Sequence, residues 1–509
     1  MLNIALNVNK SRASIYNLIF TYISSFIQIF NSIILLPLYL SFFTLTDYGA
    51  WVASAAIIHI FLIIDPGLSS VTTTKLSQAF SADDDSKFQS IFLSGILLAL
   101  FMALLTYILG MLLLSIVPSL IVYEGGRQDE IDLAMHINII ALALTPLASV
   151  LHSYFQALLQ TFVGSVLYVC SIIISPFTII FCLFNDWGIA SLPMGIMASN
   201  IFAVFVYSLG IIYFWTKYTN TSFFIVKNLN FSTLFHDVKY LYLKRFSSAL
   251  SENLETSFAG IFFNTQVSGS VAIIKKLISS IQLFSNGVAT STYSSLSHAF
   301  EENNPYRLKN ALNKTLYATD LIQVIGICIL FLAYKPFIFI WLGQEITQGY
   351  LFMILLAFSS FMYIKSNLLY TMLASNGLFK ETSLIFVLEI AVRLVGTYLL
   401  IKVISLYALP VAAILGSATT LLILSFILIK KSGISLKEIL ISFNLYESML
   451  FTLSILLGYF INYPSNMTDA IYSGLITLVP FIFFVLLGKK LRTFLLEVYK
   501  SYILRAKNN

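Results

Sequence analysis

The fold is decided by the stretch from Gly49 to Phe80, GAWVASAAIIHIFLIIDPGLSSVTTTKLSQAF, because a related stretch follows 220 residues later. This second copy runs from Gly269 to Phe300 and reads GSVAIIKKLISSIQLFSNGVATSTYSSLSHAF. Aligned without a gap, the copies share 8 identities in 32 positions. The identical pairs are Gly49/Gly269, Ile58/Ile278, Gly67/Gly287, Thr72/Thr292, Leu76/Leu296, Ser77/Ser297, Ala79/Ala299 and Phe80/Phe300.

The two copies also end alike. The first is followed by the acidic patch 83–85 and the second by the acidic pair 301–302. A basic residue then follows in register, Lys87 in one copy and Arg307 in the other. The matched ends support a true internal repeat, and two similar halves in a membrane chain are typical of a secondary transporter.

The composition requires a membrane. Hydrophobic residues make up 58% of the chain and charged residues 10%, with a mean hydropathy of +0.89. In soluble domains about a quarter of the residues are charged, so this chain has too few charged residues to cover the surface of a soluble globular protein. The net charge of +6 is therefore explained by membrane topology, and no nucleic-acid partner is expected. Its three cysteines lie in apolar stretches without ligand spacing, so no metal or redox cofactor is expected.

A bilayer-crossing helix needs about 20 mainly apolar residues. This rule predicts fourteen spans, and hence an all-α integral membrane protein. The predicted spans are 14–41, 49–78, 89–117, 131–159, 163–184, 187–215, 243–264, 270–298, 312–334, 348–374, 381–403, 406–429, 447–463 and 470–488.

Charge provides a separate test of this count. With residue 1 in the cytoplasm, the inside loops and span ends hold 22 Lys and Arg residues, and the outside ones hold 3. Such a bias follows the positive-inside rule and predicts that both termini are cytoplasmic. The two copies of the repeat begin six spans apart, so both enter from outside and the repeat is parallel. We therefore predict pseudo-symmetric lobes at 1–230 and 231–430, followed by a C-terminal helix pair and basic tail at 431–509.

Four spans are too polar to face lipid. The first carries a one-sided stripe at the 4, 3, 4, 3 spacing of a helix face. Its members are Asn17, Thr21, Ser24, Gln28 and Asn31. The end of the second span is rich in serine and threonine, and the seventh span contains two glutamates. The eighth span contains lysines, serines and Asn286. Spans 1, 2, 7 and 8 are thus predicted to line a wet central cavity, although isolated serines can also join helices to one another.

Lysines inside spans are the candidate contacts for an anionic cargo. Lys275 and Lys276 lie one or two turns inside the outer face, and the alternative is that they snorkel to that interface. Lys365 lies near the middle of the tenth span, where a charge is expensive and needs a partner. Gln28, Asn31 and Asn286 complete the predicted substrate-binding set.

The remaining intramembrane charges are assigned to ion coupling or charge balance. Glu389 and Arg393 are four residues apart and can pair on one helix face. Glu252 and Glu255 share a face of the seventh span and could bind a coupling cation or balance the lysines. Asp65 precedes Pro66 and Gly67, and could pair with a base or cap a helix break. Lys75 is placed at the inner cavity mouth. These charges nearly cancel, so a strongly cationic cavity does not follow.

The residues now carry a resemblance to a known family. The chain resembles Wzx-type O-antigen flippases, in the polysaccharide-transporter branch of the multidrug/oligosaccharidyl-lipid/polysaccharide flippase superfamily. The likeness covers nearly the whole chain and has four parts. They are LTDYGAW (45–51), DPGLSSVTTTK (65–75), the eighth span (272–300) and LLYTMLASNGLFK (368–380). Pro66 departs from the residue usual at its position.

This resemblance implies a fold and a function. It implies two six-helix lobes in a V plus two C-terminal helices, working by alternating access in a bacterial inner membrane. The implied cargo is a polyprenyl-pyrophosphate-linked oligosaccharide, whose head group enters the wet cavity while its tail stays in membrane lipid. Polysaccharide polymerase and chain-length machinery would be its partners.

Two other function classes remain open from the sequence. A cation-coupled multidrug exporter of the same superfamily would share the lobes, but it normally needs twelve spans and favours cationic cargo. An O-antigen polymerase or ligase would need a large outside loop for catalysis, and the predicted outside loops are short. The chain has no GxxxxGK[ST] loop, so ATP is not expected to drive it directly. We therefore do not expect an enzyme.

Overall fold

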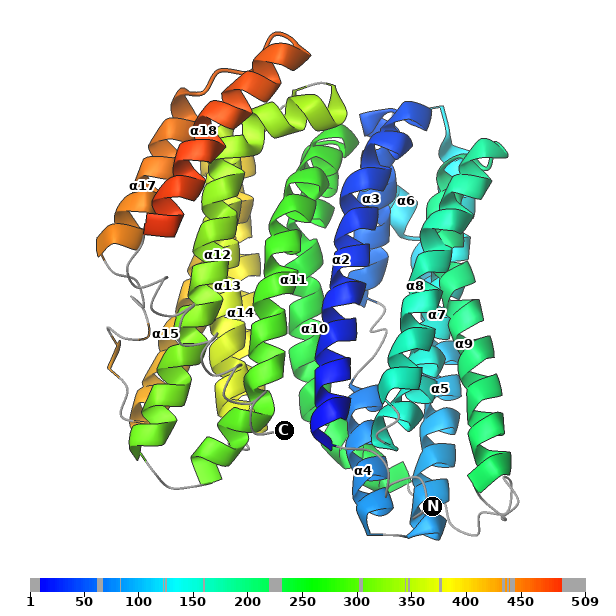
Figure 1. Ribbon diagram of the computed structural model, residues 1–509. Coiled ribbons are helices and arrows are strands. Elements are labelled where there is room, and N and C mark those ends of the chain that lie inside the picture. Colours follow the sequence, from blue (N-terminus) through cyan, green and yellow to red (C-terminus); the bar gives the residue numbers. More distant parts are fainter. Residues whose placement is uncertain are drawn as a thin grey trace. The chain divides into compact units, whose positions relative to one another are not determined.

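The computed structural model describes residues 10–61, 67–82, 84–121, 123, 126–158, 161–218, 231–301, 305–343, 345–346, 348–374, 378–432, 435–436, 439 and 445–487. Regular secondary structure in these ranges is entirely helical (Figure 1). The helices are α2 (Lys10–Phe42), α3 (Leu45–Phe61), α4 (Leu68–Ser81), α5 (Asp85–Leu114), α6 (Val117–Leu120), α7 (Gln128–Ala157), α8 (Thr161–Phe184), η1 (Gly188–Ala190), α9 (Ser191–Tyr218), α10 (Phe231–Phe262), α11 (Thr265–Glu301), α12 (Pro305–Leu342), α13 (Tyr350–Ala374), α14 (Phe379–Ile404), η2 (Ser405–Tyr407), α15 (Ala408–Ser432), α17 (Leu445–Phe460) and α18 (Met467–Leu487).

Thirteen of the predicted spans each coincide with one helix of the described residues and the second coincides with two, which confirms an all-α membrane protein of about fourteen spans. Nine stretches in this part of the chain are long and apolar enough to cross a membrane, and the longest contains both α14 and α15. The second span is divided into α3 and α4. Gly67 precedes α4 with φ of 90°, a left-handed conformation that suits glycine. Asp65 and Pro66 lie outside the described residues.

Helix boundaries confirm the register of the repeat. α2 ends at Phe42 and α10 at Phe262, while α3 begins at Leu45 and α11 at Thr265. Further along, α4 ends at residue 81 and α11 at residue 301, and α5 begins at 85 and α12 at 305. Each of these four pairs is separated by the 220 residues that the sequence alignment gave. The copies differ at one point, since α11 continues through Gly287, whereas the equivalent Gly67 lies outside a helix and directly precedes α4.

The described chain forms two compact units. Unit 1 contains residues 1–276 and 369–424, and unit 2 contains residues 277–368 and 425–509. Their limits follow packing within the structure and do not test the predicted lobes at 1–230 and 231–430, which stay a prediction.

Unit 1 has an aromatic core. Within unit 1, α7 packs against α5 and α9, and α8 packs against α9 and α2 (Figure 1). Helix α10 packs against α3 and α14. Phe88 and Phe92, one turn apart on α5, face Tyr154 of α7 with ring centroids 5.8 and 5.1 Å away. Phe155 meets Tyr207 of α9 at 5.8 Å. Rings and aliphatic side chains thus interlock these helices at one level.

In unit 2 the C-terminal helices pack on α12. Figure 1 shows α17 and α18, in orange and red, beside this helix. Phe481 of α18 joins Val324, Cys328 and Leu332 of α12 in a buried apolar cluster. Lys335 Nζ donates to the carbonyl oxygens of Tyr459, at 3.0 Å, and of Ile461, at the C-terminal end of α17. A cation is favoured there by the helix dipole.

Candidate functional site

Four of the predicted charges meet in unit 1. Glu255 of α10 binds two cations, because one carboxylate oxygen accepts from Lys275 Nζ of α11 and the other accepts from the guanidinium of Arg393 of α14. Arg393 also lies 3.6 Å from the carboxylate of Glu389, one turn earlier on α14. The predicted pairing of Glu389 with Arg393 is therefore confirmed. We call Lys275, Glu255, Arg393 and Glu389 the unit-1 charge cluster.

The unit-1 charge cluster is neutral and mostly enclosed. Its two carboxylates balance its two cations, and the side chains of Glu255 and Glu389 are 2% and 0% exposed. Ser417 of α15 donates to Glu389 at 3.2 Å, so four helices contribute to the cluster. Lys275 additionally donates to the backbone oxygen of Glu252, at 2.6 Å, while the Glu252 side chain itself is exposed. The sequence left two roles open for Glu255, binding a coupling cation or balancing the lysines. In this structure its carboxylate contacts Lys275.

A second ion pair lies in unit 2. Lys365 Nζ of α13 donates to a carboxylate oxygen of Asp320 of α12 at 2.7 Å, with the two side chains 1% and 0% exposed. Gln323, one turn along α12, is also buried, and its amide finds no hydrogen-bond partner in the described part of the chain. The sequence reading missed Asp320, although an aspartate in the predicted ninth span is itself a signal. Its burial and short contact favour a structural role for Lys365, while the predicted cargo contact stays untested.

Lys276 has a different environment. It is half-buried in unit 1, and its Nζ lies 5.9 Å from the ring centroid of Tyr39 and 5.4 Å from that of Tyr48. Ring faces attract a cation, so α2 and α3 hold the ammonium group through aromatic contacts. Lys275 and Lys276 thus point to different neighbours, as the angle of about 100° between adjacent helical residues requires.

The other predicted site residues are dispersed. Gln28 of α2 hydrogen-bonds Tyr168 of α8, and Asn31 is half-buried. In unit 2, Asn286 of α11 accepts from Asn367 of α13 at 3.3 Å. Lys75 of α4 is half-buried. The wet cavity between spans 1, 2, 7 and 8 stays a prediction.

A polar network that the sequence did not predict joins the loop after α6 to the start of α3. Tyr123 donates to one carboxylate oxygen of Asp47, and the other accepts from Thr44 Oγ1 at 2.7 Å and Thr44 N at 3.1 Å. Arg127 N donates to the Tyr123 hydroxyl at 3.1 Å. Although burial opposes ionisation of Asp47, these hydrogen bonds outweigh it and lower its pKa. Burial, and then the bond to Asp47, raise the pKa of Tyr123 to about 12.

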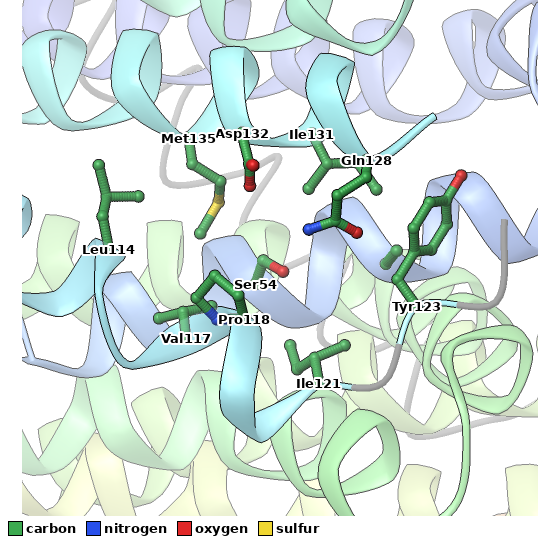
Figure 2. A pocket seen from close by; sticks show the side chains of 11 residues that line it. Ser54, Leu114, Val117, Pro118, Ile121, Tyr123, Gln128, Ile131, Asp132 and Met135 are labelled. Carbon is green, nitrogen blue, oxygen red and sulfur yellow. The ribbon is translucent and has the colours of Figure 1, made fainter. Parts of the chain in front are cut away.

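A small groove lies beside this network (Figure 2). Its polar lining comes from Ser54 of α3, from Tyr123, and from Gln128 and Asp132 of α7. Apolar side chains such as Met135 and Ile131 form the rest of the wall. Within the residues that the structure describes, no three His, Cys, Asp or Glu side chains are grouped to hold a metal ion.

Comparison with known proteins identifies the fold. No family model and no curated protein matches the sequence. Solved structures do match. An inward-facing multidrug resistance MATE family transporter of the MOP superfamily aligns with a TM-score of 0.64 and 12% identity over 83% of this chain and 99% of its own. An outward-facing transporter of the same description aligns with a TM-score of 0.60 and 14% identity, over 84% of this chain and 97% of its own. The MATE multidrug transporter DinF-BH, solved as a complex with a ligand, aligns at 0.58 and 13%, over 84% and 96%. The chain therefore has the fold of the MATE transporters.

Proposed function

We propose that this protein is a secondary transporter that flips a polyprenyl-pyrophosphate-linked oligosaccharide from the cytoplasmic to the outer leaflet by alternating access. The proposal places it in a bacterial inner membrane with both termini in the cytoplasm. Support for transport comes from the fold, whose solved examples include inward-facing and outward-facing transporters. Support for this cargo comes from the sequence resemblance and from the charges in the described spans.

The observation that carries the choice of cargo is the neutralisation of buried carboxylates. Glu255, Glu389 and Asp320 each lie within 4 Å of a lysine or arginine of the same chain. A cationic drug would have to displace these internal cations, which have the advantage of being tethered. An anionic pyrophosphate would instead need a cation that is not fully enclosed, and Lys276 is half-buried beside two tyrosines.

Chain length also supports the flippase. The matched structures align over 96–99% of their own lengths, but leave about a sixth of this chain uncovered. That share is close to the length of segment 431–509, which is 79 of 509 residues and contains α17 and α18. The resemblance to Wzx-type flippases implies this additional helix pair, whereas a twelve-span exporter would lack it.

The second candidate function is a cation-coupled multidrug exporter. The comparisons favour it directly, because the matched transporters are described as multidrug transporters and one of them was solved with a bound ligand. Glu252 is the cation contact that we propose for this function, since the residue is exposed on α10. A drug exporter and a flippase would use the same fold, so only the cargo separates them.

Deleting the protein from its native host tests the two functions together. We expect surface polysaccharide to disappear and its lipid-linked repeat unit to accumulate on the cytoplasmic side, with drug susceptibility unchanged. If susceptibility rises while surface polysaccharide persists, the exporter is the correct function. If the repeat unit reaches the outer leaflet but stays unpolymerised, the block lies after flipping and a polymerase replaces both proposals.

A further inference from the structure

The two glycines that open the repeat lie against each other within unit 1. A Cβ built on Gly49 of α3 would lie 1.7 Å from the carbonyl oxygen of Thr265 and 2.9 Å from the nitrogen of Gly269. A Cβ built on Gly269 of α11 would lie 2.8 Å from the carbonyl oxygen of Leu45 and 3.1 Å from Gly49 Cα. These spaces accept no side chain, so α3 and α11 cross backbone against backbone, an approach that glycine permits.

The contacts at this crossing are reciprocal. Gly49 meets Thr265, and Gly269 meets Leu45. Adding 220 to the first copy's residues converts one contact into the other, because Leu45 corresponds to Thr265 and Gly49 to Gly269. Contacts of the form i to j and j to i mark a two-fold axis. The pseudo-two-fold axis of the repeat therefore passes between the two glycines.

The crossing also lies at one end of both helices. α3 begins at Leu45 and α11 at Thr265, so Gly49 and Gly269 are each one turn inside their helix. The predicted topology places both of these ends at the outer face, because both spans enter from outside. Two helices in backbone contact leave no passage between them at that level.

We propose that the crossing of Gly49 and Gly269 is the outer gate of the transport cycle, closed in this structure and opened when the two repeats separate. This inference rests on the proposed function, since it needs alternating access. It assigns a specific role to the repeated glycines: they allow closure to be made by backbone atoms. An oligosaccharide head group can leave toward the outer leaflet only after this contact breaks.

The test measures access to Ile273, which follows Gly269 by one turn on α11 and is 0% exposed. Ile273→Cys is introduced after the native cysteines are replaced, and labelling by an impermeant thiol reagent is followed from outside intact cells. In the parent the closed gate should make labelling slow. Gly49→Ala places a methyl group 1.7 Å from a carbonyl oxygen, so it should disfavour closure and speed labelling by about tenfold or more. The matched control is Gly474→Ala on α18, where the nearest atom to the new Cβ is 3.9 Å away.

Unchanged labelling in a folded Gly49→Ala variant overturns the gate. If that variant does not fold, the pair Leu45→Cys and Thr265→Cys replaces it, joined by a short reducible thiol cross-linker. Locking these ends should abolish transport, and reduction should restore it; transport that continues while cross-linked overturns the gate equally. Neither readout depends on the cargo's identity, because labelling of the introduced thiol requires no cargo and the lock can be assayed with any transported molecule. A wrong cargo and a wrong gate are therefore told apart.

Discussion

Removing one partner of the Asp320–Lys365 pair should destabilise the protein far more than removing both. The carboxylate and ammonium groups are 2.7 Å apart, and their side chains are 0% and 1% exposed. Lys365→Met would leave a buried carboxylate without its cation, and Asp320→Asn would leave a buried ammonium group. Breaking a buried pair in this way costs about 3–5 kcal/mol. The double variant Asp320→Leu/Lys365→Met removes both charges and should lie between about neutral and a few kcal/mol more stable than the parent.

The assay heats the purified protein in one detergent and measures, at each temperature, the fraction of the protein that stays monodisperse. Arg127→Gln provides the matched control, because the Arg127–Glu130 pair is 3.4 Å long but its side chains are 40% and 37% exposed. An exposed pair contributes about 0.2–1 kcal/mol, so the control should unfold close to the parent. Single variants as stable as the parent, or a double variant no better than the singles, would refute the pairing.

The same variants decide the role of Lys365. If the lysine is structural, the double variant should keep both stability and transport. If it contacts cargo, as the sequence predicted, the double variant should be stable and inactive. A loss of transport that tracks the loss of stability in the single variants carries no information about cargo, which is why the double variant is needed.

Three further outcomes are expected. Lys276→Ala should reduce flipping more than Lys276→Arg, because a pyrophosphate needs a positive partner in a site of low dielectric, and equal transport rates would remove this lysine from the cargo path. Hydrogen bonds to the Asp47 carboxylate lower its pKa in the folded protein. Ionised Asp47 therefore stabilises the fold fully above the ordinary aspartate pKa, and this stabilisation is lost as the pH falls through the lowered pKa of the folded state. Asp47→Asn should therefore flatten the acid limb of a stability–pH profile that is steep below about pH 4 in the parent, and coincident profiles would exclude this role. Ser279→Cys, on an exposed part of α11, should react with an impermeant thiol reagent in at least one transport state, whereas Leu104→Cys, 57% exposed on an apolar helix, should stay inert in lipid; equal reactivity would contradict the cavity.

The sequence was sufficient for the helices because each span is a local property. About 20 apolar residues define a crossing wherever the helix later packs, and the loop charges check the count. The repeat register was also readable, since identical glycines and matched ends locate it without knowledge of neighbours. Its confirmation came from positions that the alignment did not use, the helix ends at Phe42 and Phe262.

Side-chain contacts between different helices could not be predicted from such local patterns. Periodicity places Lys365 and Glu255 on a helix face, but it does not say which helix that face meets. Only the i, i+4 pair of Glu389 and Arg393 was predictable, because both residues are on one helix. The presence of Asp320 in a span was visible in the sequence, but its pairing with Lys365 was not, because that contact depends on how α12 and α13 pack. The Tyr123 contact with Asp47 joins positions 76 residues apart and has no local signal.

Because the pairing of charges between helices cannot be predicted from the sequence, a count of the charges inside the spans does not predict the charge of the cargo. Glu255 binds two cations at once, so the sign of a region depends on how its charges are shared and not on their number. A carboxylate already bound by a tethered guanidinium attracts a mobile cation weakly, because that ion must first break a contact formed at low dielectric. Ring faces attract a cation but carry no net charge, so the two tyrosines near Lys276 do not themselves neutralise it. Replacement of Lys276 by Ala or Arg is therefore the substitution at which we expect the flippase and the exporter to differ most.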